Sequence, residues 1–244
     1  MAANVKQMLL HFLTEYQSLN ELPQSAIMPA MKRRQLTPVD RLLAGVDSFL
    51  KTVTAAPTHG TRESPARQVD DKPMSASEKS HAAALMRVNH AGEIAAQGLY
   101  QGHAAVARDP SIESQMQRAA DEELDHLAWC EERLKELGSA PSRLSPVWYS
   151  GAFVMGAASG ILGDRWSLGF IEETERQVVQ HLTGHLDRLP ADDAKSRAIV
   201  HQMRDEEALH GASAKDAGAA ELPARVRRLM GLTAKIMTRT AYWL

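Results

Sequence analysis

The pattern of hydrophobic and polar positions predicts helices along most of the chain. From about residue 75 onward, apolar residues return every three or four positions, and no stretch of alternating β-branched residues suggests a strand. The expected helices begin at capping residues or prolines, which lie at Ser75, Asp109-Pro110, Ser145-Pro146, Asp164, residues 190–193 and Pro223. We therefore expect an all-α protein whose helices are long enough to form a bundle.

The N-terminal part of the chain has a different pattern. Residues 31–53 show helical spacing of apolar positions and predict a short amphipathic helix. Residues 54–74 turn polar and contain three prolines, which is typical of a linker. Residues 1–30 are interpreted as an extension that need not be native, because Met31 offers a second start. The bundle is expected to occupy residues 75–244.

Composition narrows the possible functions. The 244 residues include 28 Lys and Arg against 30 Asp and Glu, so no basic field predicts a nucleic-acid partner. A single cysteine, Cys130, excludes an internal disulfide and a metal cluster built from cysteines alone. The apolar run at residues 8–13 is too weak for a secretory signal, which favours an intracellular protein.

Two segments are candidates for contact with a membrane. Residues 144–163 carry no charge, but serines, a proline and four glycines argue against a spanning helix, and we expect a buried or membrane-surface helix. Residues 224–244 carry five basic side chains and no acidic one, together with an apolar side. This last helix is expected to pack on the bundle, to contact an anionic membrane surface, or both.

One pattern, DEExxH, occurs twice, at residues 121–126 and 205–210. Residues three apart lie on one helix face, so each copy presents a carboxylate and an imidazole to one point. A single Glu-x-x-His is a weak signal, and a run of acids is usually a solvated helix face. The duplication of the whole pattern favours a metal site. The two pairs are Glu123 with His126 and Glu207 with His210.

Each motif follows another acid at a similar distance. Glu93 lies 30 residues before Glu123, and Glu175 lies 32 residues before Glu207, which suits two antiparallel helical hairpins. Packed together, the hairpins would place four carboxylates and two imidazoles around one cavity, the ligand set of di-iron and di-manganese carboxylate bundles. Cations are needed there, because buried carboxylates repel one another. We expect Glu123 and Glu207 to bridge two metal ions, with Glu93 and Glu175 terminal.

Further residues are candidates for supporting roles. Acids next to the ligands are expected to bond the histidine nitrogens that face away from the metal; these are Glu122, Glu206, Asp121 and Asp205. Two histidines near the acids could line a substrate pocket, and these are His90 and His181.

Several stretches of the chain resemble the demethoxyubiquinone hydroxylases, ferritin-like di-iron monooxygenases of ubiquinone biosynthesis. The resemblance extends from about Leu36 to Leu244. Its most specific part is Arg-Val-Asn-His-Ala-Gly-Glu at residues 87–93. The other matching stretches are residues 99–102, the two DEExxH segments, residues 174–178 and the closing Ala-Tyr-Trp-Leu.

The resemblance implies a fold, a cofactor and a reaction. The fold would be a ferritin-like four-helix bundle with additional N-terminal, glycine-rich and C-terminal helices. Two iron ions (Fe²⁺) would be held by the six side chains named above. The enzyme would use dioxygen to hydroxylate the ring of 2-polyprenyl-3-methyl-6-methoxy-1,4-benzoquinol, giving 3-demethylubiquinol. It would lie peripherally on the cytoplasmic face of the cell membrane, with accessory proteins of ubiquinone biosynthesis as further partners.

Three other functions remain open on the sequence alone. The same ligand set occurs in iron-storage and ferroxidase proteins of the ferritin type, and in peroxide-reducing di-metal enzymes. A helical scaffold with solvated acids is the third alternative.

Overall fold

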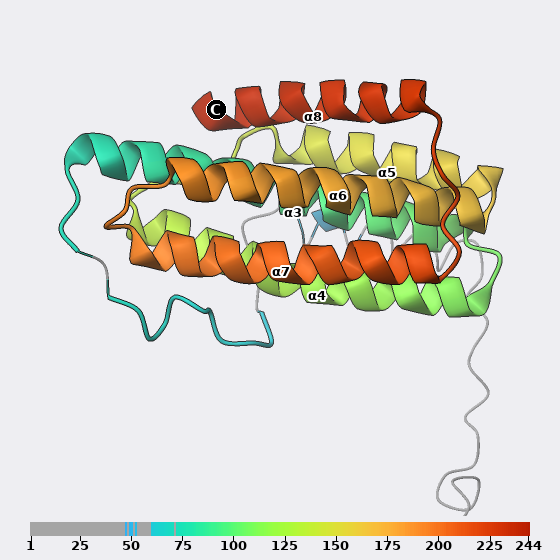
Figure 1. Cartoon of the computed structure of the whole chain (residues 1–244), viewed down its shortest axis with the longest axis horizontal. Coiled ribbons are helices and arrows are strands. Elements are labelled where there is room, and N and C mark those ends of the chain that lie inside the picture. Colours follow the sequence, from blue (N-terminus) through green and yellow to red (C-terminus); the bar gives the residue numbers. More distant parts are fainter. Residues whose placement is uncertain (1–46, 48, 51, 53–59, 71) are drawn as a thin grey trace, which may run out of the picture. The chain divides into compact units, whose positions relative to one another are not determined.

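The computed structural model describes residues 47, 49, 50, 52, 60–70 and 72–244, all within one compact unit, Arg41–Leu244. The described residues contain no β-strand, which confirms the all-α prediction. Figure 1 shows the helices in order: α3 (Ala76–Val106), α4 (Pro110–Glu136), α5 (Ser145–Leu162), α6 (Asp164–Arg188), α7 (Ala194–Asp216) and α8 (Ala224–Trp243).

Part of the N-terminal prediction lies outside the described residues. Of the helix expected at residues 31–53, only Asp47, Phe49, Leu50 and Thr52 are described, and all four are helical. The extension at residues 1–30 lies wholly outside. Within residues 54–74, the described positions form neither helix nor strand before Ala76. The proposed domain boundaries therefore stay a prediction.

The helices begin where capping chemistry predicts them. Ser75 and Glu78 form a reciprocal capping box at the start of α3, with Ser75 N donating to Glu78 Oε2 at 2.8 Å. Asp109 caps α4, and Asp193 caps α7 by accepting from Ser196 N at 2.9 Å. These caps fix the first residues of α3, α4 and α7. They therefore also fix how far along each helix axis Glu93, Glu123 and Glu207 lie.

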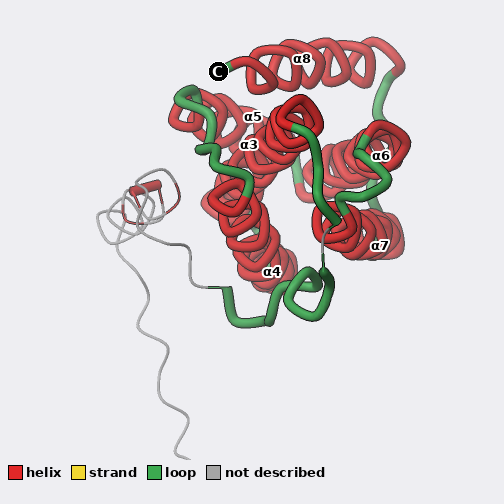
Figure 2. The backbone as a smooth tube through the Cα atoms, turned by 90° about the vertical axis from the view of Figure 1, so that its left-hand side faces the viewer, coloured by secondary structure: helices red, strands yellow, loops and turns green. Residues whose placement is uncertain are grey.

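Four helices form the bundle: α3 and α4 make one antiparallel hairpin, and α6 and α7 make the other. Figure 2 looks along these helices and shows the two hairpins facing one another, with α5 and α8 outside them. Buried apolar residues from all four helices form a shared core, including Leu85, Leu134, Leu182 and Met203. This arrangement is the ferritin-like four-helix bundle that the resemblance implied.

The glycine-rich helix α5 packs against α3 at very short range. A Cβ atom built on Gly98 would lie 2.3 Å from Tyr149 O, and one on Gly102 would lie 2.2 Å from Phe153 O. Glycine at these positions therefore lets the two backbones touch. The opposite side of α5 exposes apolar side chains such as Val154 and Leu162. Within the described part of the chain, no helix combines the length and apolarity that a bilayer crossing requires.

The C-terminal helix α8 packs across α3 and α6. Tyr242 hydroxyl bonds His81 Nδ1 at 2.7 Å, and Arg87 Nη1 donates to Tyr242 O at 2.9 Å. Its outer side exposes Leu229, Ile236 and Trp243. Packing on the bundle is thus confirmed, while contact with a membrane stays a prediction.

Candidate metal site

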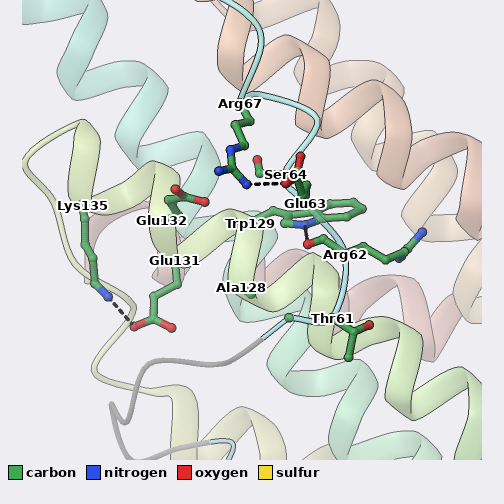
Figure 3. Close-up of a pocket in the computed structure, with 11 residues that line it drawn as sticks. Thr61, Arg62, Glu63, Ser64, Arg67, Ala128, Trp129, Glu131, Glu132 and Lys135 are labelled. Carbon is green, nitrogen blue, oxygen red and sulfur yellow. Dashed lines mark hydrogen bonds and ion pairs between the residues drawn. The ribbon is translucent and has the colours of Figure 1, made fainter.

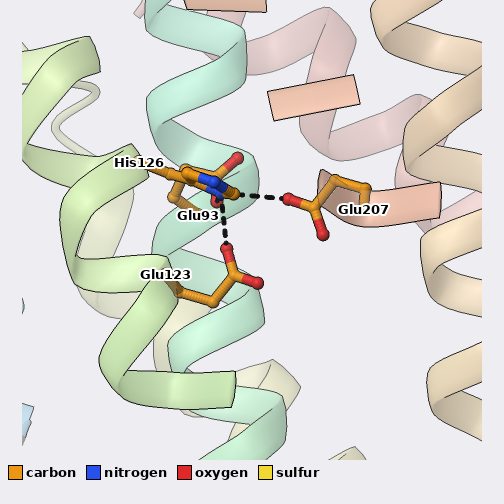
Figure 4. A group of neighbouring side chains, drawn as sticks. All are labelled: Glu93, Glu123, His126 and Glu207. Atoms are coloured by element: carbon orange, nitrogen blue, oxygen red, sulfur yellow. Dashed lines mark hydrogen bonds and ion pairs between the residues drawn. The ribbon is translucent and has the colours of Figure 1, made fainter. Parts of the chain in front are cut away.

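Four acidic and imidazole side chains from three helices converge inside the bundle. Glu93 comes from α3, Glu123 and His126 from α4, and Glu207 from α7, and one ligand atom of each lies within 4.8 Å of the others (Figure 4). All four side chains are buried, with at most 3% of each residue exposed. The spacing of the sequence motifs therefore translates into one enclosed cluster.

Two glutamates each contact both histidines. Glu123 Oε2 lies 3.1 Å from His126 Nδ1, and its Oε1 lies 3.1 Å from His210 Nδ1. Glu207 Oε1 lies 3.2 Å from His126 Nδ1, and its Oε2 lies 3.1 Å from His210 Nδ1. Each carboxylate thus directs one oxygen to each histidine, which is the arrangement a carboxylate bridge between two cations requires.

The other two acids lie at the ends of this group. Glu93 Oε2 lies 3.6 Å from His126 Nδ1. Glu175 is buried on α6 and accepts a hydrogen bond from the Tyr100 hydroxyl at 2.6 Å. The charges of Glu207, Glu123 and His210 all act on Glu175. The structure therefore places Glu93 with Glu123, His126 and Glu207, and the contacts of the two central glutamates add His210. Glu175 is coupled to this group electrostatically. The assignment of bridging and terminal ligands stays a prediction.

The electrostatics of the cluster are those of a cation site. Burial and the charge of Glu123 raise the pKa of Glu93, and burial and the charge of Glu207 raise the pKa of Glu175. Burial alone would lower the pKa of His210, but hydrogen bonds and charges from Glu123 and Glu207 outweigh it and raise that pKa to about 12. The cluster thus strongly favours positive charge at its centre.

The donor atoms fit iron or manganese. Within the described residues, Glu93 Oε2 is buried without a hydrogen-bond partner, so it has lone pairs available to a metal. Four carboxylates and two imidazoles are hard and borderline donors that suit these metals, whereas structural zinc sites usually recruit thiolates.

Two outer carboxylates, those of Glu122 and Glu206, bind the histidine nitrogens that face away from the centre of the cluster. His126 Nε2 donates to Glu206 Oε2 at 2.6 Å, and His210 Nε2 donates to Glu122 Oε2 at 2.7 Å. These bonds place a proton on each Nε2, so that Nδ1 of each histidine faces the central glutamates. The predicted supporting role of Glu122 and Glu206 thus has a geometric basis, but each acid serves the histidine of the opposite motif.

The two aspartates of the motifs are placed elsewhere, which corrects the expectation that they support the histidines. Asp121 accepts from Gln117 at 3.2 Å, and Asp205 accepts from Arg204 at 2.7 Å. Each aspartate precedes its ligand glutamate by two positions. Residues two apart do not share a helix face, so both side chains point away from the site into solvent.

Three residues at the site were not predicted from the sequence. Tyr100 lies seven positions after Glu93, two turns along the same face, and this spacing could have revealed it. Asp125 is 3% exposed and binds Arg62, whose guanidinium also binds Glu206. Arg62 follows no periodic pattern, so no sequence signal pointed to it.

The two histidines suggested for a substrate pocket have different surroundings. His181 lines a pocket of about 440 Å³ between α3, α6 and α8, together with Val88, His185 and Tyr242. His90 is buried on α3 outside that lining, and burial lowers its pKa to about 4. Their role toward a substrate stays a prediction.

A second pocket, of about 600 Å³, lies between residues 60–67 and α4 (Figure 3). Arg62, Trp129 and Lys135 line it, and none of the six predicted ligands does. The Trp129 ring lies 5.4 Å from the His126 ring, centre to centre. This pocket is therefore next to the metal site but does not open onto the ligand atoms.

Comparison with known proteins shows the family. A family model described as ubiquinone biosynthesis protein COQ7 matches residues 80–241, a range that contains all six predicted ligands. A 3-demethoxyubiquinol 3-hydroxylase of Chromobacterium violaceum is 52% identical over 84% of this chain and 98% of its own. The proteins of the same name from Nitrosococcus oceani and Cupriavidus necator are 50% and 53% identical, over 88% and 84% of this chain and 100% and 99% of theirs. The chain therefore belongs to the COQ7 family of ubiquinone biosynthesis proteins, and it is a hydroxylase.

Proposed function

We propose that this chain uses dioxygen and two iron ions to hydroxylate the ring of 2-polyprenyl-3-methyl-6-methoxy-1,4-benzoquinol, giving 3-demethylubiquinol. The observation that carries the proposal is the pair of glutamates, Glu123 and Glu207, that each contact both His126 and His210 within 3.2 Å. The names of the relatives support the substrate class.

The six side chains divide naturally between two metal positions. Glu93 and His126 would complete one position, and Glu175 and His210 the other, with the two central glutamates shared. When bound, a pair of irons supplies electrons to dioxygen and Lewis acidity toward the oxygen atoms.

The protein's own side chains prepare this centre. Burial of these side chains excludes bulk water, which strengthens the electrostatic interactions within the site and would keep water away from the reaction. The Tyr100 hydroxyl holds one oxygen of Glu175 and leaves the other for a metal. Glu122 and Glu206 keep the Nε2 protons on their histidines, so that Nδ1 is the donor toward the centre.

The quinol ring would enter through the pocket that His181 lines. His181 is six residues after Glu175 on α6, and Val88 is five residues before Glu93 on α3, which places the pocket about 7–9 Å along the helices from the acids. His185, also in the lining, is 2% exposed, and burial lowers its pKa to about 2. Imidazoles beside Tyr242 and Trp243 suit an aromatic ring, and Arg188 and Arg239 in the same lining offer donors to its oxygen atoms.

The outer faces of α5 and α8 would rest on the cytoplasmic face of the cell membrane, where a polyprenyl tail is dissolved. Val154 and Leu162 on α5 are 66% and 67% exposed, and Leu229 and Trp243 on α8 are 61% and 77% exposed. Exposed basic residues accompany them on α8, as expected for an anionic lipid surface; they are Arg225, Arg228, Lys235 and Arg239. Accessory proteins of ubiquinone biosynthesis would bind the assembled enzyme.

Quinone profiling of a deletion strain tests the proposal. The strain should accumulate the demethoxy precursor, and this chain should restore ubiquinone, whereas the Glu123→Ala variant should not. Normal ubiquinone in a strain that lacks every such hydroxylase would refute the proposal. A large cage in size-exclusion chromatography, without restored ubiquinone, would instead indicate an iron-storage protein.

A further inference from the structure

The two halves of the metal site are alike in sequence, but the carboxylates that bind Nε2 of the two histidines differ in solvent exposure. His126 Nε2 bonds Glu206, whose side chain is 17% exposed, whereas His210 Nε2 bonds Glu122, whose side chain is 56% exposed. His126 itself is fully buried, and the His210 side chain is 13% exposed. One histidine is therefore backed by an enclosed carboxylate and the other by a solvated one.

The enclosed carboxylate is fixed by further partners. Arg62 donates to both oxygens of Glu206, from Nη1 at 2.6 Å and from Nη2 at 3.0 Å. Gln202 Nε2 donates to Oε1 of the same residue at 2.6 Å. Within the described part of the chain, the structure shows no second partner for Glu122. A paired, two-pronged contact fixes a carboxylate far better than a single bond from a flexible side chain.

Arg62 is itself anchored to α4. Its Nε donates to Asp125 Oδ2 at 2.5 Å, and its backbone N donates to Asp125 Oδ1 at 3.2 Å. The guanidinium lies 4.9 Å from the centre of the Trp129 ring, and Trp129 Nε1 donates to Arg62 O at 3.3 Å. Arg62 thus connects Asp125 on α4 to Glu206 on α7, directly outside His126.

The backbone of residues 60–62 also lies close to α4. A Cβ atom on Gly60 would lie 3.0 Å from Asp125 Oδ1 and 3.2 Å from Ala128 Cβ, and Thr61 N donates to the same Asp125 oxygen. The carboxylate of Asp125 therefore receives two successive backbone N–H groups and one guanidinium. These contacts hold Arg62 in place independently of its bond to Glu206.

We propose that Arg62 is a positioning residue that makes the two metal positions unequal in affinity. By holding Glu206 against His126, it causes the position that contains His126 to bind its ion more tightly. That position therefore fills before the one that contains His210. The inference rests on the proposed di-metal function. Its physical basis is that a fixed outer carboxylate orients the imidazole and raises its basicity before the metal arrives. Glu122, with one partner among the described residues and a solvated side chain, does this less well for His210.

Anaerobic titration of the metal-free full chain with Fe²⁺, against a chromophoric chelator, tests the order of filling. The unchanged chain should bind two ions in separate steps. Arg62→Gln should weaken the tighter step by about 10–100-fold and leave the weaker step unchanged, so that the two steps approach one another. Fluorescence of Trp129, whose ring lies 5.4 Å from that of His126, should respond mainly to the first ion in the unchanged chain and to both in the variant.

Matched variants separate positioning from a general loss of structure. Glu206→Gln should weaken the same step, Glu122→Gln should weaken only the other, and Arg62→Lys should restore part of the tighter step. Arg67→Gln is the control: Arg67 pairs with exposed Glu63 in the same segment and should leave both steps unchanged. Circular dichroism of each metal-free variant reports folding.

The possible failures are distinguishable. If the unchanged chain binds two ions in one step, or if Arg62→Gln and Glu206→Gln weaken both steps equally or neither, the role of Arg62 is refuted while the di-metal function stands. If the unchanged chain binds no Fe²⁺, the proposed function fails, and this inference fails with it.

Discussion

Glu206 on α7 accepts a hydrogen bond from Nε2 of His126 on α4, at 2.6 Å. Its counterpart in the repeat, Glu122 on α4, accepts from His210 on α7. The outer carboxylates are thus exchanged between the two hairpins, and the inner glutamates also reach across. A substitution in one motif should therefore lower metal affinity at both positions only when it removes a bridging glutamate.

Replacing a bridging glutamate should cost both ions. In Glu123→Ala or Glu207→Ala, each histidine loses a neighbouring oxygen, so we expect metal content to fall from two ions per chain to nearly none. Helical content should persist, because the core of the bundle lies around residues such as Leu85 and Leu182. Elemental analysis with circular dichroism measures both quantities. Two ions retained in both variants would refute the bridging assignment.

Removing the Tyr100 hydroxyl should weaken the metal position that Glu175 completes. In Tyr100→Phe, Glu175 loses the donor that fixes one of its oxygens at 2.6 Å, and we expect that step of Fe²⁺ binding to weaken about 10-fold. Tyr242→Phe is the control for metal content, because its hydroxyl bonds His81 outside the site. Equal metal affinity of Tyr100→Phe and the unchanged chain would show that the hydroxyl does not position this ligand.

The parts of the site that could be predicted from the sequence are those that depend on residues close together in the chain. The pairs Glu123–His126 and Glu207–His210 depend only on helix periodicity, and the sequence was sufficient for them. Placing Glu93 and Glu175 needed only the assumption of two antiparallel hairpins. The exchange of outer carboxylates between hairpins depends on the rotation of one helix against another, which no local pattern encodes.

The fold shows the same division. Helix starts such as Ser75 and Asp109 follow from capping chemistry within a few residues. The close contact of α3 with α5 depends on glycines of both helices: a Cβ on Gly98 would lie 2.3 Å from Tyr149 O, and one on Gly156 would lie 2.3 Å from Leu99 O. Neither glycine shows its partner in the sequence. Arg62 lies in a segment without periodicity, so only the folded chain reveals its contact with α4.

Adding a methyl group at Gly98 should destabilise the bundle. The new Cβ would lie 2.3 Å from Tyr149 O, so α5 must move away from α3, at a cost of about 1–3 kcal/mol. Gly151→Ala is the matched control, because a Cβ there meets nothing within 4 Å and should stabilise the helix by about 0.5–1 kcal/mol. Urea unfolding of the metal-free variants measures both. An unchanged midpoint for Gly98→Ala would contradict the packing described.

Binding to lipid vesicles should depend on the exposed apolar side chains of α8. Leu229→Ser with Trp243→Ser removes two side chains that are 61% and 77% exposed, so the fold should be unaffected while binding to anionic vesicles falls at least 10-fold. Vesicle sedimentation measures the bound fraction. Leu209→Ser on α7, equally exposed at 66%, is the control that should change nothing. Equal loss in the control would indicate non-specific hydrophobic adsorption.

Acid should destabilise the protein through His103, which joins three helices. His103 lies on α3 and shares hydrogen bonds through Nδ1 with Ser159 on α5 and Ser167 on α6. Burial lowers its pKa to about 4, below the 6.5 expected when unfolded, so between these values the unfolded chain binds more protons and stability falls as pH falls. His103→Gln should be less stable than the unchanged chain at pH 8, and the difference should shrink toward pH 5. Urea unfolding with chelator present measures it, with exposed His201→Gln as control; a difference independent of pH would contradict the assignment.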